Sequence, residues 1–202
     1  MHQLPEADTE GRKTVSRAVA DRESRRSFAD EPLDETDVAQ ALWSAQGVTH
    51  QRDGVEMRAA PSAGATYPLT VFLEVRRNGC ETLGAGVYRY VPDAEPHAVE
   101  EHTASSVRDE LVAAAGGQNV VRDAPVSVVM TADYAITTRE YPHHGERYVH
   151  MEAGHAAQNV HLVCEERGMV SCPVGAFSDE AVASAMGIET EPLYIVPFGK
   201  PP

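Results

Sequence analysis

The chain has 202 residues, of which 31 are acidic and 17 basic, so its formal net charge at neutral pH is −14. Such a negative surface repels phosphate backbones, which argues against a protein that binds nucleic acid. The sequence has no apolar run long enough to span a bilayer, and its first residues lack a signal-peptide pattern. We therefore expect a cytoplasmic protein without membrane contact, folded as one domain over residues 1–202, with residues 1–11 forming a flexible segment.

The basic residues are almost all arginine, because Lys13 and Lys200 are the only lysines. An acid-rich, lysine-poor composition is typical of proteins from a high-salt cytosol, although high-GC codon usage also replaces lysine by arginine. A halophilic source is therefore a hypothesis, and it predicts greater stability in molar salt than in dilute buffer.

Cysteine and histidine spacings do not predict a metal site. Cys80, Cys164 and Cys172 include no C-x-x-C pair and cannot all form disulfides, which indicates a reducing compartment. Cys164 falls on a helical apolar stripe, where a buried thiol is the usual outcome. The histidines between positions 143 and 161 lack the H-E-x-x-H pattern and a pair four residues apart on one helix face. We expect no bound metal.

In the first part of the chain, apolar residues at helical spacing predict helices over residues 11–22 and 34–47. The second helix has a start signal at Asp34, with acidic residues in its first turn, and Gly47 ends it. Residues 48–60 are polar without a clear period, so we expect a loop there.

The middle of the chain predicts strands and one helix. Residues 70–76 and 86–91 have the composition of two antiparallel neighbouring strands with a long connection. Residues 103–115 are helical in pattern and are followed by two glycines that end the helix. Residues 126–132 form a continuous apolar run, which predicts a central strand buried on both faces.

The last part contains the longest predicted helix, over residues 146–167, with an apolar stripe along one face and Gly168 at its end. A short helix near residues 180–186 and a final strand at residues 193–198 follow. Helices and strands are interspersed without a repeated β-α-β unit, which indicates an α+β fold with a mixed sheet. No Rossmann or Walker glycine pattern is present.

Residues 61–68 read P-S-A-G-A-T-Y-P and stand directly before a predicted strand. Two prolines enclose small residues whose backbone N–H groups are uncovered, so a ligand can approach the backbone closely. A turn before a strand is the alternative interpretation of this composition.

Four further segments accompany this element in a fixed order: R-E-S-R-R-S-F at 22–28, R-Y at 147–148 with E-A-G-H-A-A-Q-N at 152–159, P-V-G-A-F at 173–177, and P-L-Y-I-V-P-F-G-K-P at 192–201. Together with the P-S-A-G element, they resemble the nitroreductase superfamily of FMN enzymes, and specifically its SagB/ThcOx-type branch. The resemblance covers nearly the whole chain from Arg22 onward. It implies a nitroreductase-like α+β fold, with a mixed, mainly antiparallel sheet flanked by helices and completed by homodimerisation.

The resemblance also implies how the chain would hold FMN. Arg22 and Ser24 would contact the phosphate and ribityl region with Glu23 beside them, and Lys200 would contact the phosphate. Arg26 would lie close to the polar edge of the ring, four residues from Arg22 on the same helix end. Arginines suit a phosphate dianion because they form bidentate, charge-assisted hydrogen bonds. Solvated side chains are the alternative for all of these charges.

Near the flavin ring, the resemblance implies contacts from Val174, Gly175 and Ala176. A backbone N–H there could reach the reactive ring nitrogen and tune its potential without blocking substrate. A plain tight turn is the competing interpretation. In this superfamily the P-S-A-G element covers the flavin of the partner subunit. The resemblance therefore implies a homodimer with FMN at the subunit interface, and the crossing contacts would be made by Pro61, Ser62, Ala63 and Ala65.

One position departs from the family pattern. Azoline-oxidising members of the branch carry a Lys-Tyr pair ahead of the R-Y helix, and the corresponding residues here are Glu140 and Tyr141. These two are the acid/base candidates, and Glu140 could act as a base in place of the lysine. The substitution favours a stand-alone reductase over a peptide oxidase.

The sequence thus predicts an FMN-dependent oxidoreductase that passes hydride from NADH or NADPH to a small electron-poor acceptor, such as a nitroaromatic or a quinone. The flavin would carry the hard step, while Arg26 and the backbone at residues 175–176 would stabilise the reduced ring. Three alternatives remain: a dehydrogenase that oxidises a heterocycle in a peptide-derived substrate, a flavin-binding subunit without turnover, and a flavin-free scaffold.

Overall fold

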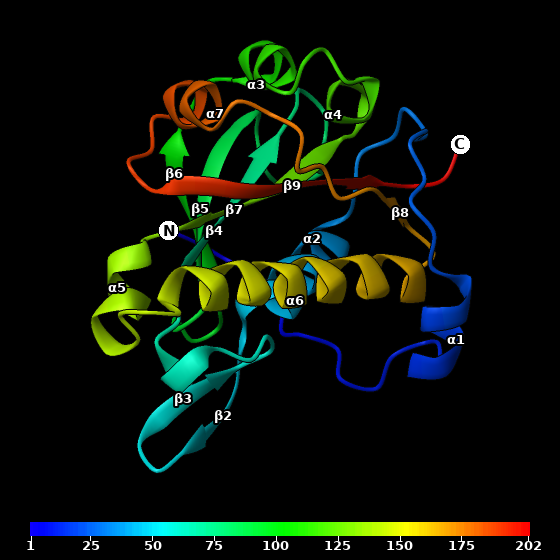
Figure 1. Ribbon diagram of the computed structural model, residues 1–202. Helices are drawn as coiled ribbons and strands as arrows, with labels where there is room; N and C mark the ends of the chain where they lie inside the picture. Colours follow the sequence, from blue (N-terminus) through cyan, green and yellow to red (C-terminus); the bar gives the residue numbers. More distant parts are fainter.

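The computed structural model describes residues 1–202, and its centre is a seven-stranded sheet (Figure 1). The strands follow the order β1-β6-β5-β4-β7-β9-β8, and every ladder between them is antiparallel. Parallel pairing is limited to isolated bridges, Ser24 with Ser171 and Leu33 with Cys80. The bounds are β1 His2–Gln3, β4 Leu69–Val75, β5 Gly86–Val91, β6 Ala98–Thr103, β7 Val126–Ala132, β8 Val170–Ser171 and β9 Glu191–Gly199.

The predicted central strand is confirmed, because β7 lies between β4 and β9 and all seven of its residues are buried. The predicted antiparallel neighbours are β4 and β5, which pair from Phe72 with Arg89 to Val75 with Gly86. A run without polar alternation forms such a strand because both of its faces meet apolar layers.

Helices cover both faces of the sheet, which gives three layers (Figure 1). The face with the larger core is covered by α2 and α6, and the opposite face by α3, α4 and α7 (Figure 1). The helices are α1 Val15–Asp21, α2 Glu35–Gln46, α3 Arg108–Ala114, α4 Asn119–Asp123, α5 Tyr134–Glu140, α6 Gly145–Glu166 and α7 Asp179–Met186. No helix has the length and apolar character needed to cross a membrane.

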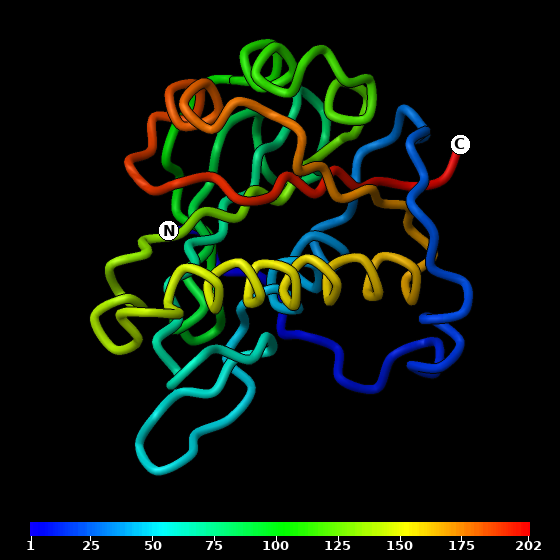
Figure 2. The backbone as a smooth tube through the Cα atoms, in the orientation of Figure 1, coloured from blue at the N-terminus to red at the C-terminus, as the bar shows by residue number.

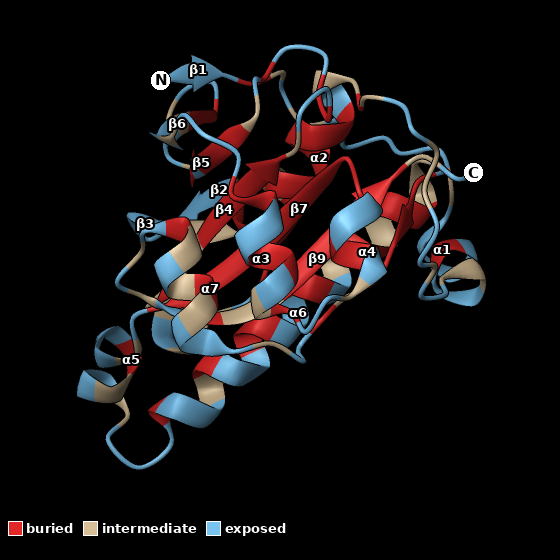
Figure 3. Ribbon diagram, turned by 90° about the horizontal axis from the view of Figure 1, so that it is seen from above, coloured by how far each residue is buried: buried red, intermediate tan, exposed pale blue.

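Each face of the sheet has its own apolar core, and both helical layers expose their outer sides (Figure 3). The apolar stripe predicted on α6 is buried, including Val149, Ala156, Val160 and Cys164. The helix α2 begins where expected, since the Asp34 side chain accepts a hydrogen bond from the Asp37 N–H at 2.9 Å.

The loop expected over residues 48–60 is wrong. This segment forms a separate β-hairpin with strands β2 Val48–Arg52 and β3 Val55–Arg58, which projects from the domain (Figure 1). Its turn residues Asp53 and Gly54 both have positive φ, as a tight two-residue hairpin turn requires. The hairpin lacks apolar alternation because β2 is mostly exposed, so Asp-Gly was its only sequence signal.

Several elements were not predicted: β6, the two-residue strands β1 and β8, the short helices α4 and α5, and the 3-10 turn at Ala63–Ala65. The helix expected from residue 103 starts only at Arg108, because Thr103 still belongs to β6. Short helices of five to seven residues offer too few turns for a readable apolar period.

The first eleven residues, expected to be a flexible segment, make specific contacts. Strand β1 pairs with β6, and Leu4 is buried in the larger core. The side-chain amide of Gln40 on α2 accepts from the Asp8 N–H at 2.8 Å and donates to the Asp8 carbonyl at 2.9 Å.

A buried ion pair fastens the α3–α4 layer to the sheet. Glu74 on β4 has no exposed surface, and its Oε1 accepts from Nε of Arg108 on α3 at 3.1 Å. The same guanidinium donates to the Val121 carbonyl on α4. Burial raises the pKa of Glu74 to about 7, although Arg108 and Arg76 act in the opposite direction.

Candidate functional site

The segment that follows α1 and the C-terminal end of the chain meet beside strand β8. Ser24 bridges to Ser171, the Arg25 N–H donates to the Ser171 carbonyl at 3.1 Å, and the Ala29 N–H donates to the Lys200 carbonyl at 3.0 Å. The red C-terminal end and the blue segment after α1 can be followed side by side in Figure 2. One region therefore contains five of the predicted cofactor-binding residues: Arg22, Glu23, Ser24, Arg26 and Lys200. We call it the cationic group after its two arginines and its lysine.

Gly199 permits this close approach of the segment after α1 and the C-terminal end. A Cβ atom at position 199 would lie 2.6 Å from Cδ of Pro125 and 3.1 Å from the ring of Phe28. Only a residue without a side chain allows the strand end to approach these two rings, which explains the glycine directly before Lys200.

Arg22 and Arg26 do not share a helix end, so that prediction is wrong. The helix α1 ends at Asp21, Arg22 is its C-terminal cap, and the following residues are extended because Ser24 bridges to Ser171. Arg22 instead donates from Nη1 to Nε2 of His161, on α6, at 3.1 Å.

His161 holds Arg22 in place as a buried, neutral base. Burial, together with the nearby charge of Arg22, lowers the pKa of His161 to about 4. Because Arg22 can only donate, Nε2 must accept, so Nδ1 carries the proton and donates to Oγ of Ser171 at 2.5 Å. This chain of hydrogen bonds fixes the direction of the Arg22 guanidinium.

The arginines of this region differ in whether a carboxylate already neutralises them. Arg25 pairs with Glu23 at 2.8 Å and with Glu165 at 3.5 Å. Arg26 is exposed and donates only to the Ser24 carbonyl, at 3.4 Å, while Lys200 reaches Glu31 only at 3.5 Å. Arg22 and Arg26 thus have no carboxylate partner, and Lys200 has one long pair with the exposed Glu31, so these three cations can still bind a strong anion.

Residues 174–176 run along the middle of β9. Val174 is buried and pairs with Ile195 through two hydrogen bonds, of 2.7 and 3.0 Å. Gly175 and Ala176 are exposed, and no atom lies within 4 Å of the Cβ that a side chain at Gly175 would add. The amide of Gln118, the N-cap of α4, donates to the Ala176 carbonyl at 2.9 Å and fixes this turn from the other side.

Gly175 opens onto a cavity of 290 Å³ between β9, α6 and the start of α7. Its lining includes His150 and Ala153 on α6, Asp179 on α7 and Glu191 on β9. This cavity is close to the residues assigned to the flavin ring, whereas the larger surface hollows of the chain lie elsewhere.

The P-S-A-G element forms a tight loop on another side of α6. Oγ of Ser62 accepts from the Tyr67 N–H at 2.9 Å, and Gly64 and Ala65 have φ values of 60° and 53°. Pro61 is exposed, and Ser62 and Ala63 line a 230 Å³ cavity with Tyr148, Met151, Glu152 and His155 of α6. A left-handed conformation at Ala65 is uncommon for a residue with a side chain, so the loop is tightly constrained.

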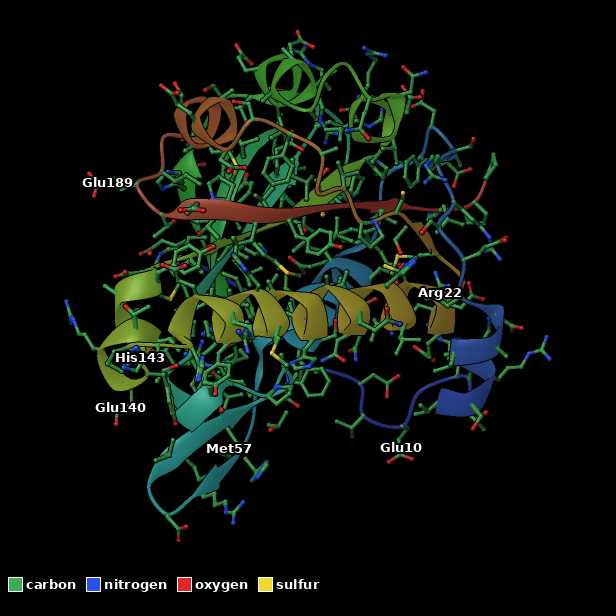
Figure 4. The ribbon with its side chains drawn as sticks, in the orientation of Figure 1. Glu10, Arg22, Met57, Glu140, His143 and Glu189 are labelled. Carbon is green, nitrogen blue, oxygen red and sulfur yellow. The ribbon has the colours of Figure 1, made fainter.

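Tyr141 packs against this loop, whereas Glu140 points into solvent at the end of α5 (Figure 4). A Cβ atom at Gly64 would come within 2.7 Å of the Tyr141 hydroxyl. Figure 4 also shows Arg22 near the opposite end of α6 from Glu140. Within one chain, the cationic group is therefore separated from the acid/base candidates by most of the length of α6.

The buried carboxylate of Glu152 lies beneath the loop. The sequence marks this residue only as the first of the E-A-G-H-A-A-Q-N motif, without a role of its own. Glu152 is 2 % exposed and accepts from the amide of Gln46 at 3.1 Å. Burial raises the pKa of Glu152 to about 7, while hydrogen bonds from Ser62 and Gln46 lower it. Arg58 stands over the ring of Tyr67 at 4.7 Å and completes the support of the loop.

Comparison with known proteins identifies the class to which this fold and this site belong. The model of the Nitroreductase family matches residues 19–200. The chain belongs to the nitroreductase family. A relative in Methanocaldococcus jannaschii, the provisionally named nitroreductase MJ1384, is 38% identical over 181 residues, covering 89% of this chain and 87% of its own.

Three further similarities concern solved structures and a peptide-processing relative. A provisionally named nitroreductase from Ralstonia eutropha JMP134 superposes over 100% of this chain and 89% of its own, with a TM-score of 0.84 and 26% identity. The microcin B17-processing protein McbC of Escherichia coli is 28% identical over 152 residues, 72% of this chain and 55% of that protein. The structure of the E. coli microcin synthetase McbBCD shares the fold, with a TM-score of 0.75 over 92% of this chain and 73% of that one.

Proposed function

We propose that this nitroreductase-family oxidoreductase binds FMN, accepts hydride from NADH or NADPH, and reduces a small electron-poor acceptor. The observation that carries the proposal is the presence of Arg22, Arg26 and Lys200 near one end of β9, with the open Gly175 turn beside the middle of the same strand. Of these cations, only Lys200 has a carboxylate partner, Glu31 at 3.5 Å. Five residues of extended chain separate Ile195 from Lys200, or about 17 Å. This suits an elongated ligand with a phosphate at one end and a flat ring at the other.

The residues present fit FMN. Arg22 and Lys200 would hold the phosphate in a chain that is otherwise strongly acidic, with the exposed Ser24 beside them, and Arg26 would lie toward the polar edge of the ring. The uncovered turn at Gly175 leaves room for a ring against the backbone, where a side chain would intrude. When bound, the flavin supplies reversible hydride chemistry. The residues named above would bind the flavin and orient it.

Purified protein is expected to show the visible absorption of a bound flavin, and anaerobic NADH or NADPH should bleach it. The more effective donor identifies the nicotinamide preference. A flavin band that persists with both donors would instead support a peptide-type dehydrogenase or a subunit without turnover. A protein that stays colourless after addition of FMN would contradict the proposal.

We further propose a homodimer in which the loop at residues 61–65 of one chain covers the flavin held by the other. Within one chain, the loop and the residue 174–176 turn face different sides of α6, since they line separate cavities with different α6 residues. The loop at residues 61–65 therefore does not contact the turn at residues 174–176 of the same chain. The exposed Met151, beside Pro61 in the loop's cavity, gives this face an apolar contact.

Co-expression of two inactive variants tests this arrangement. Arg22→Ala/Lys200→Ala removes the phosphate contacts, and Gly64→Val disrupts the loop because the new side chain clashes with Tyr141. If the loop acts on the partner's site, random pairing should restore about one quarter of the sites, all of them in mixed dimers. If each chain completes its own site, the mixture stays inactive. Each variant expressed with itself is the control.

A second candidate function is oxidation of an azoline or another heterocycle in a peptide-derived substrate. The similarity to McbC, a microcin-processing protein, favours it, although the chain spans only 55% of that protein. The lysine of azoline-oxidising members is replaced here by Glu140, which is exposed at the end of α5. Dehydrogenation of an azoline peptide without nicotinamide would support this candidate.

A further inference from the structure

A polar cluster of three residues borders the cavity onto which Gly175 opens. The hydroxyl of Tyr134, on α5, lies 2.6 Å from Nε2 of His150, on α6, and 3.5 Å from Oε1 of Glu191, on β9. His150 and Glu191 both line the cavity. The rings of Tyr134 and His150 meet edge to face, with centroids 5.5 Å apart, which fixes the plane of the imidazole.

This cluster contains a group that can donate a proton and a group that orients it. Tyr134 is half-buried, and burial, followed by the charge of Glu191, raises the pKa of Tyr134 to about 12. The phenol therefore stays neutral and serves as a fixed hydrogen-bond partner of Nε2. His150 is exposed, so its imidazole can exchange protons with water, and Nδ1 is the nitrogen left for another partner.

We propose that His150, oriented by Tyr134, donates the proton that an electron-poor acceptor takes up together with hydride. This role rests on the proposed function, since it concerns the acceptor of the same site. The acceptor would then lie in the cavity between Gly175 and His150. It would be a quinone or another compound that takes up a proton when it is reduced. Neither Glu140 nor Tyr141 lines that cavity.

The step balances in electrons and protons. A quinone that receives hydride gains two electrons and one proton, and it needs a second proton on its other oxygen to become a hydroquinone. His150 in its imidazolium form gives that proton and becomes neutral. Water restores it, because the side chain is exposed. General acid catalysis of this kind contributes about 10²-fold or more to a rate.

Several charged groups lie around His150 and Tyr134. Glu191 comes from β9 and Asp179 from α7, and both line the cavity. Glu146, one turn before His150 on α6, also acts on Tyr134. Carboxylates from three elements thus surround the Tyr134–His150 pair.

The test compares two electron acceptors with protein reduced beforehand under anaerobic conditions. Benzoquinone needs a proton, whereas ferricyanide takes single electrons and needs none. His150→Gln should slow reoxidation by benzoquinone about 10²-fold and leave reoxidation by ferricyanide unchanged. Tyr134→Phe should cause a smaller fall for benzoquinone only, with a shifted pH profile. His50→Gln, an exposed histidine on the β2–β3 hairpin, is the matched control and should change neither rate.

A second readout needs no cofactor. In the cofactor-free protein, NMR should show that Tyr134→Phe changes the titration midpoint and the tautomer of His150. Equal loss with both acceptors, no loss with benzoquinone, or an unchanged His150 titration would overturn the proposal. Failure of the proposed function differs from these outcomes, because the wild-type protein would then bind no flavin and reduce neither acceptor. That result would remove the basis of both proposals.

Discussion

An Arg22→Ala/Lys200→Ala variant is expected to bind FMN about 10²- to 10⁴-fold more weakly than the wild-type protein. Each cation would form charge-assisted hydrogen bonds to the phosphate; Arg22 has no carboxylate partner, and Lys200 has only a long, exposed pair with Glu31 at 3.5 Å. The loss at Arg22 should be the larger part, because His161 holds that guanidinium in a fixed direction. Titration of the cofactor-free protein with FMN, followed by flavin fluorescence, measures the change.

Riboflavin provides the matched ligand, since it has the same ring and ribityl chain but no phosphate. Its affinity should be nearly the same for the variant and the wild-type protein. The matched protein control is Arg17→Ala/Arg25→Ala, which also removes two positive charges, but from arginines that pair with Asp21 and Glu23. An equal loss of riboflavin and FMN would mean that these residues do not contact the phosphate.

The sequence predicts those elements whose burial requires a regular pattern of apolar residues. Strand β7 is buried over its whole length and helix α6 has one buried face, so both carry an apolar pattern that a single sequence displays. The β2–β3 hairpin is mostly exposed, and its residues are under no such constraint. It was therefore mistaken for a loop, despite the Asp-Gly pair at its turn.

The candidate site was predictable only as a set of segments. The motifs identified Arg22, residues 61–65 and Lys200, but their arrangement depends on contacts between distant parts of the chain. His161 is 139 residues from the arginine it holds, and no local pattern links the two. The same applies to His150, which meets Tyr134 only because α5 packs against α6. The P-S-A-G loop and the turn at Gly175 are likewise separated because they pack on different sides of α6, which the sequence does not indicate.

Arg108→Ala is expected to lower the free energy of unfolding by about 3–5 kcal/mol at pH 8, because it leaves the carboxylate of Glu74 buried without its partner. Glu74 has no exposed surface, so water cannot replace the guanidinium. The Val121 carbonyl on α4 also loses a donor. Urea unfolding followed by circular dichroism measures the loss.

The loss should depend on pH in a defined direction. Burial already raises the pKa of Glu74 to about 7 while Arg108 lowers it, so removal of Arg108 raises this pKa further. A carboxyl group with a raised pKa in the folded state is most favourable below its unfolded value of 4.5 and loses stability as the pH rises through the folded value. The deficit of the variant should therefore be small near pH 5 and largest near pH 8.

The double variant Glu74→Leu/Arg108→Met separates the unpaired charge from the lost contact with α4. Replacing a buried ion pair with apolar residues is often neutral or stabilising, so the double variant should recover most of the lost stability and show no pH-dependent deficit. If it remains as unstable as Arg108→Ala, the contact with the Val121 carbonyl is the main contribution. That outcome would bear on the site as well, because α4 begins after Gln118, whose amide fixes the turn at Ala176. FMN binding should then weaken together with stability, whereas a loss due only to the buried charge would leave the affinity for FMN unchanged.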